Sequence, residues 1–194
     1  MPDRDTIHVC YAIHDAHGTY CKFLGTAIYS MLANTSAPVT VHVLHDSTLS
    51  QENRERLNEM VCSHGKELRL YDVDALMGER LRRIEGRLPS ILQSRLSPAA
   101  IYRLLLGDLL GSAISRVIYL DADTIVNLDI RELWQEQTGQ AGLAAVCEKH
   151  LAHGYNIPKH LCKIGRVSDE RYFNAGVLLI EMDAIRSRPK LLDE

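Results

Sequence analysis

The run Val117-Ile118-Tyr119-Leu120 constrains the fold most, because it is apolar throughout and ends directly at Asp121. A continuous apolar run of this length is typical of a strand that is buried on both faces of a parallel sheet. By composition and alternation, further strands are predicted at residues 8–13, 39–45, 67–73, 143–146 and 177–180.

Helices are predicted between these strands. Within residues 20–32 apolar side chains recur every three or four positions, so one stripe of a helix can face a core. Ser50 and Gly65 are placed to cap and to end a second helix. Ser97-Pro98 predicts the start of a third, which runs towards Leu110.

Two further segments are predicted, one irregular and one helical. Residues 74–96 hold Gly78, Gly86 and Pro89 in a charged stretch, which predicts an irregular, partly helical excursion. Asp183 is placed to cap a last helix that Pro189 limits.

The alternation of strands and helices predicts an α/β fold with a doubly wound, mostly parallel sheet and helices on both faces. With 194 residues, 46% of them hydrophobic, the chain has the balance of one domain spanning residues 1–194. Ligands of such sheets bind outside the carboxyl ends of the strands. The loop of His14 and Asp15 and the triplet Asp121-Ala122-Asp123 are therefore expected on one edge.

Composition argues against several classes. The formal net charge of -3 makes a broad nucleic-acid surface unfavourable. The cysteines number five, an odd count without CxxC spacing, which is typical of free thiols in a reducing cytoplasm. No stretch approaches the ~20 apolar residues of a membrane span, and no signal-peptide run follows Met1. We therefore expect a cytoplasmic protein without a nucleic-acid partner or a transmembrane segment.

Asp121 and Asp123 are candidate metal ligands. Residues two apart in an extended segment project to the same side, so both carboxylates can aim at one point. Two carboxylates this close repel each other unless a cation lies between them. Hard oxygen ligands favour Mg²⁺ or Mn²⁺, which commonly bind carboxylates together with substrate phosphates. The spacing alone also fits an Asx-turn with a solvated second carboxylate.

The wider context resembles a known family. Residues 117–129, Val-Ile-Tyr-Leu-Asp-Ala-Asp-Thr-Ile-Val-Asn-Leu-Asp, resemble the signature of retaining glycosyltransferases of family eight, which includes bacterial lipopolysaccharide galactosyltransferases and glycogenin. Ile101-Tyr102-Arg103-Leu104 resembles the family's tyrosine-arginine helix, and residues 172–179 resemble its asparagine-alanine-glycine motif. Residues 41–46 and 128–134 are similar to family segments too, so the resemblance extends from about Val9 to Met182.

This resemblance implies a GT-A fold and transfer of a hexose, glucose or galactose, from a UDP-sugar to a saccharide or glycoconjugate acceptor. Asp121 and Asp123 would hold Mn²⁺ or Mg²⁺ against the diphosphate. Asn174 would line the transferred sugar, and Glu148 takes the position of an acidic residue on the acceptor side; these two are the candidate catalytic residues. The implied donor contacts are Ala12, His14, Asp15, Arg103, Ala122, Asn174 and Ala175.

Each assignment has a plainer alternative. Arg103 could be a surface salt-bridge partner, Asn174 could merely start a turn, and Glu148 could be a solvated charge. His14-x-x-His17 and His150-x-x-His153 lack cysteine or acidic partners at zinc-site spacing, so neither is favoured as a metal site. His8, His42 and His45 are read as strand residues.

The sequence departs from the family pattern in two places. Family members carry a later His-x-x-Gly-x-x-Lys-type motif that supplies a third metal ligand, and the sequence ends at Glu194 without it. We therefore expect a chain that lacks the family's C-terminal part and that binds metal and nucleotide weakly and transfers sugar poorly or not at all. The family's acidic-acidic-Asn-Tyr run is replaced by residues 14–20, which leaves the base contacts open.

Two other functions compete. Asp-x-Asp-x-Thr after an apolar strand also resembles the first motif of haloacid-dehalogenase-type phosphatases, in which Asp121 would be the nucleophile and Asp123 the general acid. A non-catalytic partner domain with a GT-A fold is the other alternative. The sequence identifies neither the sugar nor the acceptor, and a homo-oligomer is an open alternative to a monomer.

Overall fold

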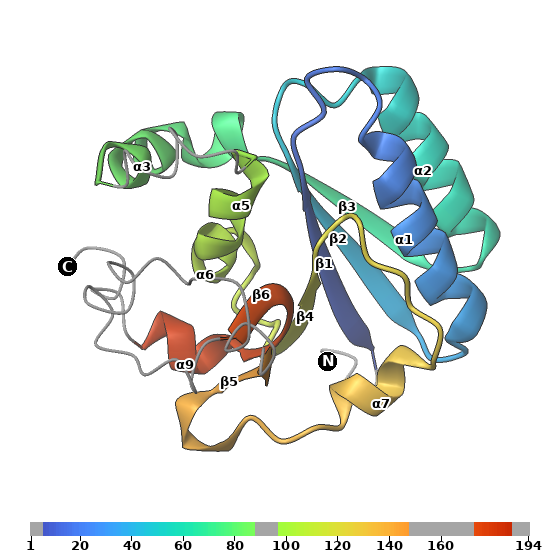
Figure 1. Ribbon diagram of the computed structural model, residues 1–194, viewed down its shortest axis with the longest axis vertical. Helices are drawn as coiled ribbons and strands as arrows, with labels where there is room; N and C mark the ends of the chain where they lie inside the picture. The colour runs from blue at the N-terminus through green and yellow to red at the C-terminus, as the bar shows by residue number, and fades with distance from the viewer. Residues whose placement is uncertain (1–5, 88–96, 148–172, 188–194) are drawn as a thin grey trace, which may run out of the picture.

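The computed structural model describes residues 6–87, 97–147 and 173–187. These residues form a six-stranded sheet in the order β3-β2-β1-β4-β6-β5 (Figure 1). The strands β3, β2, β1 and β4 are parallel neighbours, whereas β6 runs antiparallel to both β4 and β5. The predicted mostly parallel sheet is confirmed, and β6 makes it a mixed one. The strands are β1 (Ile7–Ile13), β2 (Val39–His45), β3 (Glu67–Asp72), β4 (Arg116–Leu120), β5 (Leu143–Cys147) and β6 (Phe173–Glu181).

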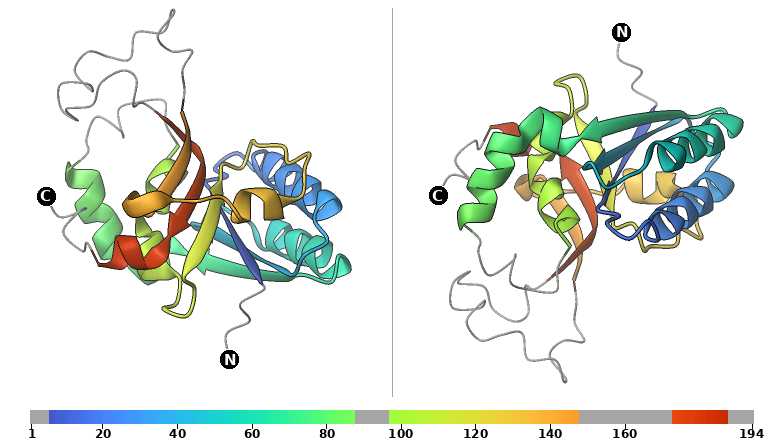
Figure 2. Two further views of the ribbon diagram at one scale, coloured as in Figure 1. Left: turned by 90° about the horizontal axis from the view of Figure 1, so that it is seen from below. Right: turned by 90° about the horizontal axis from the view of Figure 1, so that it is seen from above.

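Helices cover both faces of the sheet, as predicted (Figure 2). One face carries α1 (Cys21–Asn34), α2 (Gln51–Ser63) and α7 (Ile130–Trp134). The opposite face carries α3 (Val73–Arg87), α5 (Ala99–Tyr102), the 3₁₀ turn η1 (Arg103–Leu105), α6 (Leu106–Leu109) and α9 (Met182–Arg186). A second 3₁₀ turn, η2 (Gly139–Ala141), precedes β5.

Strand β4 shows why its sequence is apolar at every position. Ile118 and Leu120 pack into the core beneath α1, while Val117 and Tyr119 pack into the core on the opposite face. All four side chains are 3% exposed or less. Truncating a side chain such as Ile118 to alanine should therefore cost about 2–5 kcal/mol of stability.

Helix α2 begins and ends at the residues that the sequence indicates. The side-chain oxygen of Ser50 accepts a hydrogen bond from the backbone N–H of Asn53 at 3.2 Å. Gly65 has φ +67, a conformation that glycine adopts without steric cost.

Helix α3 is more regular than predicted. It begins at Val73, which the sequence places in the preceding strand, and it continues through Gly78 and Gly86 with a single kink at Met77. Leu81 and Ile84, three positions apart, are both buried against the sheet, and this packing outweighs the low helix propensity of glycine. The rest of the predicted excursion, residues 88–96, lies outside the described residues.

The predicted cap of the last helix is wrong. Glu181 takes the N-cap position of α9 without a side-chain cap. Asp183 lies in the first turn instead, where its carboxylate is 3.4 Å from Arg186. Pro189 lies outside the described residues.

The described thiols of Cys10, Cys21 and Cys62 are free. Within the described part of the chain, the helices are all too short or too polar to cross a membrane.

Candidate functional site

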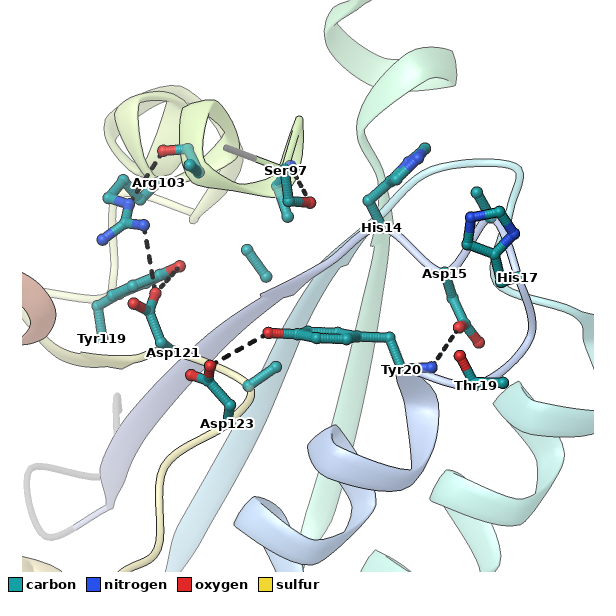
Figure 3. A pocket seen from close by; sticks show the side chains of 15 residues that line it. His14, Asp15, His17, Thr19, Tyr20, Ser97, Arg103, Tyr119, Asp121 and Asp123 are labelled. Atoms are coloured by element: carbon teal, nitrogen blue, oxygen red, sulfur yellow. Dashed lines mark hydrogen bonds and ion pairs between the residues drawn. The ribbon is translucent and has the colours of Figure 1, made fainter. Parts of the chain in front are cut away.

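A cleft of about 720 Å³ opens at the carboxyl ends of β1 and β4. These strands are parallel neighbours, with Val9 opposite Ile118, so the loops that follow them meet at one edge of the sheet. The third wall comes from the start of α5 and from η1 (Figure 3). The lining residues are Ala12, His14, Asp15, Ala16, His17, Thr19, Tyr20, Ser97, Ala99, Ala100, Arg103, Tyr119, Asp121, Ala122 and Asp123.

The loop after β4 is fixed to helix α1. The hydroxyl of Ser30 accepts a hydrogen bond from the backbone N–H of Val126 at 3.0 Å, and Asn34 donates to the carbonyl of Val126 at 2.9 Å. Ala122 is only 3% exposed and belongs to the core beneath α1. Because Ala122 points inwards, the carboxylates on either side of it are presented to the cleft.

Arg103 holds the first of these carboxylates. Its Nη2 lies 3.2 Å from Oδ1 of Asp121, and its guanidinium lies 4.7 Å from the ring centroid of Tyr119. The same guanidinium donates to the carbonyls of Ala100, at 3.0 Å, and of Ala175. With its side chain only 16% exposed, Arg103 is a wall of the cleft and not a solvated surface partner.

Tyr119 supports the same carboxylate from below. Its hydroxyl donates to Oδ1 of Asp121 at 3.0 Å. Burial raises the pKa of Tyr119, so the phenol keeps the proton that it donates. Oδ1 of Asp121 is thus occupied by two protein partners.

The Asn-Ala-Gly segment fits against the second oxygen of Asp121. A Cβ at Gly176 would lie 2.7 Å from Oδ2 of Asp121 and 2.9 Å from Oδ1 of Asn174. Oδ1 of Asn174 accepts the backbone N–H of Gly176 at 2.7 Å, and the carbonyl of Gly176 accepts the N–H of Asp121 at 2.8 Å. The glycine is needed because the carboxylate occupies the space of a side chain.

Tyr20 reaches across the cleft to the second carboxylate (Figure 3). Its hydroxyl donates to Oδ2 of Asp123 at 3.3 Å. Burial, followed by the negative charge of Asp123, raises the pKa of Tyr20. The phenol is therefore a neutral donor to Asp123.

His14 and Asp15, in the loop after β1, are both predicted to contact the nucleotide-sugar, but their surroundings differ. Nδ1 of His14 lies 2.5 Å from Oδ2 of Asp46. Asp15 is buried, and its carboxylate accepts from the N–H of Tyr20 at 2.7 Å and from the amide of Asn53 at 3.4 Å. Asp15 thus fixes the entry into α1, while His14 keeps one face on the cleft.

The predicted residues Ala12, His14, Asp15, Arg103, Asp121, Ala122 and Asp123 line one cleft together. Asn174 and Ala175 lie at its edge, linked to it through Gly176 and Arg103. Glu148, His150 and His153 lie outside the described residues. Sequence reasoning missed Tyr20, Asp46, Tyr119 and Gly176 as site residues. Gly176 could have been found from its motif, but the pairing of Asp46 with His14 depends on two loops whose contact the sequence does not show.

The two carboxylates in the cleft are suitable ligands for a hard divalent cation that also binds phosphate. The side chains of Asp121 and Asp123 both line the cleft, and both supply oxygen ligands of the kind that Mg²⁺ and Mn²⁺ prefer. In the described ranges, no group of three or more His, Cys, Asp or Glu side chains converges on one point. Two carboxylates leave most of a coordination sphere to water and to a diphosphate, as is common for these ions.

The mixed α/β sheet, with its cleft at the carboxyl ends of parallel strands, matches the GT-A type of fold. The model of the family described as Glycosyl transferase family 8 matches residues 11–189. The chain therefore belongs to glycosyl transferase family 8. The identification from the motifs in residues 101–104, 117–129 and 172–179 is confirmed.

Individual relatives agree with this assignment. The chain is 27% identical to General stress protein A of Bacillus subtilis over 183 residues, which cover 93% of this chain and 58% of that protein. It is 29% identical to a lipopolysaccharide 1,3-galactosyltransferase of Salmonella typhimurium over 182 residues, 93% of this chain and 50% of that one. The crystal structure of an active-site mutant of LgtC superposes with a TM-score of 0.74 at 27% identity, covering 93% of this chain and 59% of that one. The chain thus spans about half to three fifths of the length of these proteins.

The strand order and the contacts of Asp121 argue against the phosphatase alternative. The Asp-x-Asp motif follows β4, the fourth strand along the chain, whereas a haloacid-dehalogenase motif opens on the first. Oδ1 of Asp121 is engaged by Arg103 and Tyr119, which suits a fixed ligand better than an attacking nucleophile.

Proposed function

We propose that this chain is the donor-binding part of a metal-dependent, retaining hexosyltransferase. It would move glucose or galactose from a UDP-sugar to a saccharide or glycoconjugate acceptor. The observation that carries the proposal is the convergence of Asp121, Asp123 and Arg103 on one cleft. Membership of glycosyl transferase family 8 supports transferase chemistry, and the name of the Salmonella relative supports a galactose donor.

The diphosphate is assigned to the floor of the cleft. Asp121 and Asp123 would hold Mn²⁺ or Mg²⁺, which when bound neutralises the charge that grows on a leaving diphosphate. Arg103 adds a fixed positive charge on the same side, so it can stabilise the same developing charge without reorganising. Ala122, small and buried, leaves room for a ribose beside the two carboxylates.

The sugar is assigned to the edge where β6 begins. Asn174 and Ala175 lie there and would line the hexose, with Glu148 on the acceptor side. Retention then follows from attack on the face that the diphosphate leaves. The acceptor oxygen bonds to the anomeric carbon as the bond from that carbon to the diphosphate oxygen breaks, and the hydroxyl proton passes to the departing diphosphate.

A thermal-shift screen tests donor class and metal dependence together. The ligands are UDP, UDP-glucose and UDP-galactose, each with and without Mn²⁺. A ligand that binds only the folded state stabilises it by about 2.7 kcal/mol at one hundred times its Kd, so the melting temperature should rise most with a UDP-sugar and Mn²⁺ together. The absence of any shift with all three ligands would contradict the proposal.

A turnover assay separates the enzyme from the non-catalytic alternative. Slow release of UDP from UDP-galactose or UDP-glucose, stimulated by Mn²⁺ and lost in Asp121→Asn, is the expected result. Binding of UDP-sugar without any release of UDP, in the presence of saccharide acceptors, would favour a partner domain instead.

A further inference from the structure

Asp46 is a buried carboxylate at the end of β2, and each of its contacts is a hydrogen-bond donor. Oδ2 accepts from the hydroxyl of Tyr102 at 2.7 Å and lies 2.5 Å from Nδ1 of His14. Oδ1 accepts from the backbone N–H of Thr48 at 2.9 Å and from its hydroxyl. The side chain of Asp46 is 7% exposed, so these contacts replace most of its hydration.

The protonation state of Asp46 decides which nitrogen of His14 carries hydrogen. Burial alone would raise the pKa of Asp46, but the hydrogen bonds from His14, Thr48 and Tyr102 outweigh it and lower the pKa. Asp46 is therefore ionised and can only accept. Nδ1 of His14 must donate to it, and in a neutral imidazole Nε2 is then the acceptor.

Nε2 of His14 is available to a ligand. The His14 side chain is 27% exposed and lines the cleft, on the opposite side from Arg103 (Figure 3). Because the two ring nitrogens point in nearly opposite directions, the bond from Nδ1 to Asp46 turns Nε2 away from that carboxylate. Among the described residues Nε2 has no hydrogen-bond partner, and it is not one of the buried unpaired atoms.

We propose that Asp46 fixes His14 in the tautomer with hydrogen on Nδ1, so that Nε2 accepts the ring N–H of a uracil base and selects UDP over CDP. Uracil presents N3–H, whereas cytosine in the same pose presents the lone pair of N3, which would face the lone pair of Nε2. Asp46 is a positioning residue that acts through His14. The inference rests on the proposed function, because it requires a nucleotide diphosphate in this cleft.

The substitution Asp46→Asn should reverse the direction of the hydrogen bond. The N–H of Thr48 can only donate, so the amide oxygen must occupy the Oδ1 position. The amide nitrogen then occupies the Oδ2 position, where it donates to Nδ1 of His14. Nδ1 becomes an acceptor, hydrogen moves to Nε2, and the group that faces the cleft changes from acceptor to donor.

Two measurements at pH 8 on the intact 194-residue chain test this proposal. Two-bond ¹⁵N–¹H spectra of the imidazole rings report the tautomer, with His14→Gln identifying the signal. Calorimetry with UDP, CDP and inorganic pyrophosphate, each with Mn²⁺, reports base selection. We expect an Nδ1–H signal and UDP binding about tenfold tighter than CDP, which corresponds to one hydrogen bond. In Asp46→Asn we expect an Nε2–H signal and loss of that tenfold preference, with pyrophosphate affinity unchanged.

Asp183→Asn, at an exposed carboxylate on α9, is the matched control and should keep the wild-type preference. An Nε2–H signal in the wild type, equal affinities for UDP and CDP, or an unchanged preference in Asp46→Asn would overturn the inference. Equal binding of UDP and CDP would leave the proposed function intact. If pyrophosphate and both nucleotides fail to bind, the proposed function itself fails.

Discussion

The guanidinium of Arg103 and the carboxylate of Asp121 form an ion pair in one wall of the cleft, with Nη2 of Arg103 3.2 Å from Oδ1 of Asp121. Arg103 reaches this position from η1, and it also donates to the carbonyl of Ala175 at the start of β6. One side chain thus links three segments that are distant in the sequence. It fixes the orientation of Asp121 and leaves Oδ2 of that carboxylate for a ligand.

Arg103→Lys should weaken Mn²⁺-dependent UDP binding by about tenfold, because an ammonium cannot reproduce the planar fork that contacts both Ala175 and Asp121. The free energy of unfolding should also fall by about 1–2 kcal/mol, since a partly buried carbonyl loses its donor. Calorimetry and denaturant unfolding measure the two effects. Arg83→Lys on the exposed face of α3 is the control and should change neither. Unaltered UDP affinity in Arg103→Lys would show that the ion pair does not order the site.

Gly176→Ala should displace the carboxylate of Asp121. The added Cβ would lie 2.7 Å from Oδ2, which is too close for either group to remain in place. Overpacking of this kind typically costs about 1–3 kcal/mol, and we expect Mn²⁺-dependent UDP affinity to fall by at least about tenfold. Gly111→Ala is the matched control, because a Cβ there meets nothing within 4 Å. Equal UDP affinity in the two variants would refute the role assigned to Gly176.

The contact between half-buried His8 and fully buried His42 predicts acid lability. Nδ1 of His8 lies 3.0 Å from Nε2 of His42, and Nδ1 of His42 lies 3.0 Å from the hydroxyl of Tyr71. Burial, then the positive charges of His8 and Arg69, lowers the pKa of His42 to about 3, against 6.5 for the free group. Between those pH values the unfolded chain binds a proton at His42 that the folded chain does not. The contribution of His42 to the free energy of unfolding is therefore fully present above pH 6.5 and is lost as the pH falls.

His42→Gln should remove this component. The slope of unfolding free energy against pH between about pH 4 and 6 should become shallower by up to about 1.4 kcal/mol per pH unit, the value for one proton. Denaturant unfolding at a series of pH values measures it. His17→Gln, which removes an exposed histidine, is the comparison variant. A slope in His42→Gln as steep as in the wild type would assign the acid lability to other groups.

Much of the fold could be predicted because the positions of its strands follow from local sequence patterns. The boundaries of β2 agree with the prediction to the residue, and the run at β4 is apolar because both of its faces are buried. The direction of β6 could not be predicted, since an apolar run reads alike in parallel and antiparallel pairs. The path of α3 was also missed, because tertiary packing of Leu81 and Ile84 decides it.

The residues of the site likewise fall into those that local sequence motifs predict and those that depend on tertiary contacts. Asp121, Asp123 and Arg103 were found because they stand in recognisable sequence motifs, and the structure brings them into one cleft. Asp46 was missed because its importance arises only when the loop after β2 meets the loop after β1. Tyr20 was missed because its contact with Asp123 joins residues from two unrelated loops.

The central claim is that Asp121 and Asp123 together form a metal site that binds a nucleotide diphosphate. Calorimetric titration of UDP, with and without Mn²⁺, into the wild type and Asp123→Asn tests it most directly. The account predicts that Mn²⁺ tightens UDP binding to the wild type by about tenfold or more, and that it has no such effect on Asp123→Asn. UDP affinity that is indifferent to Mn²⁺ in the wild type, or equally enhanced by Mn²⁺ in both proteins, would contradict it.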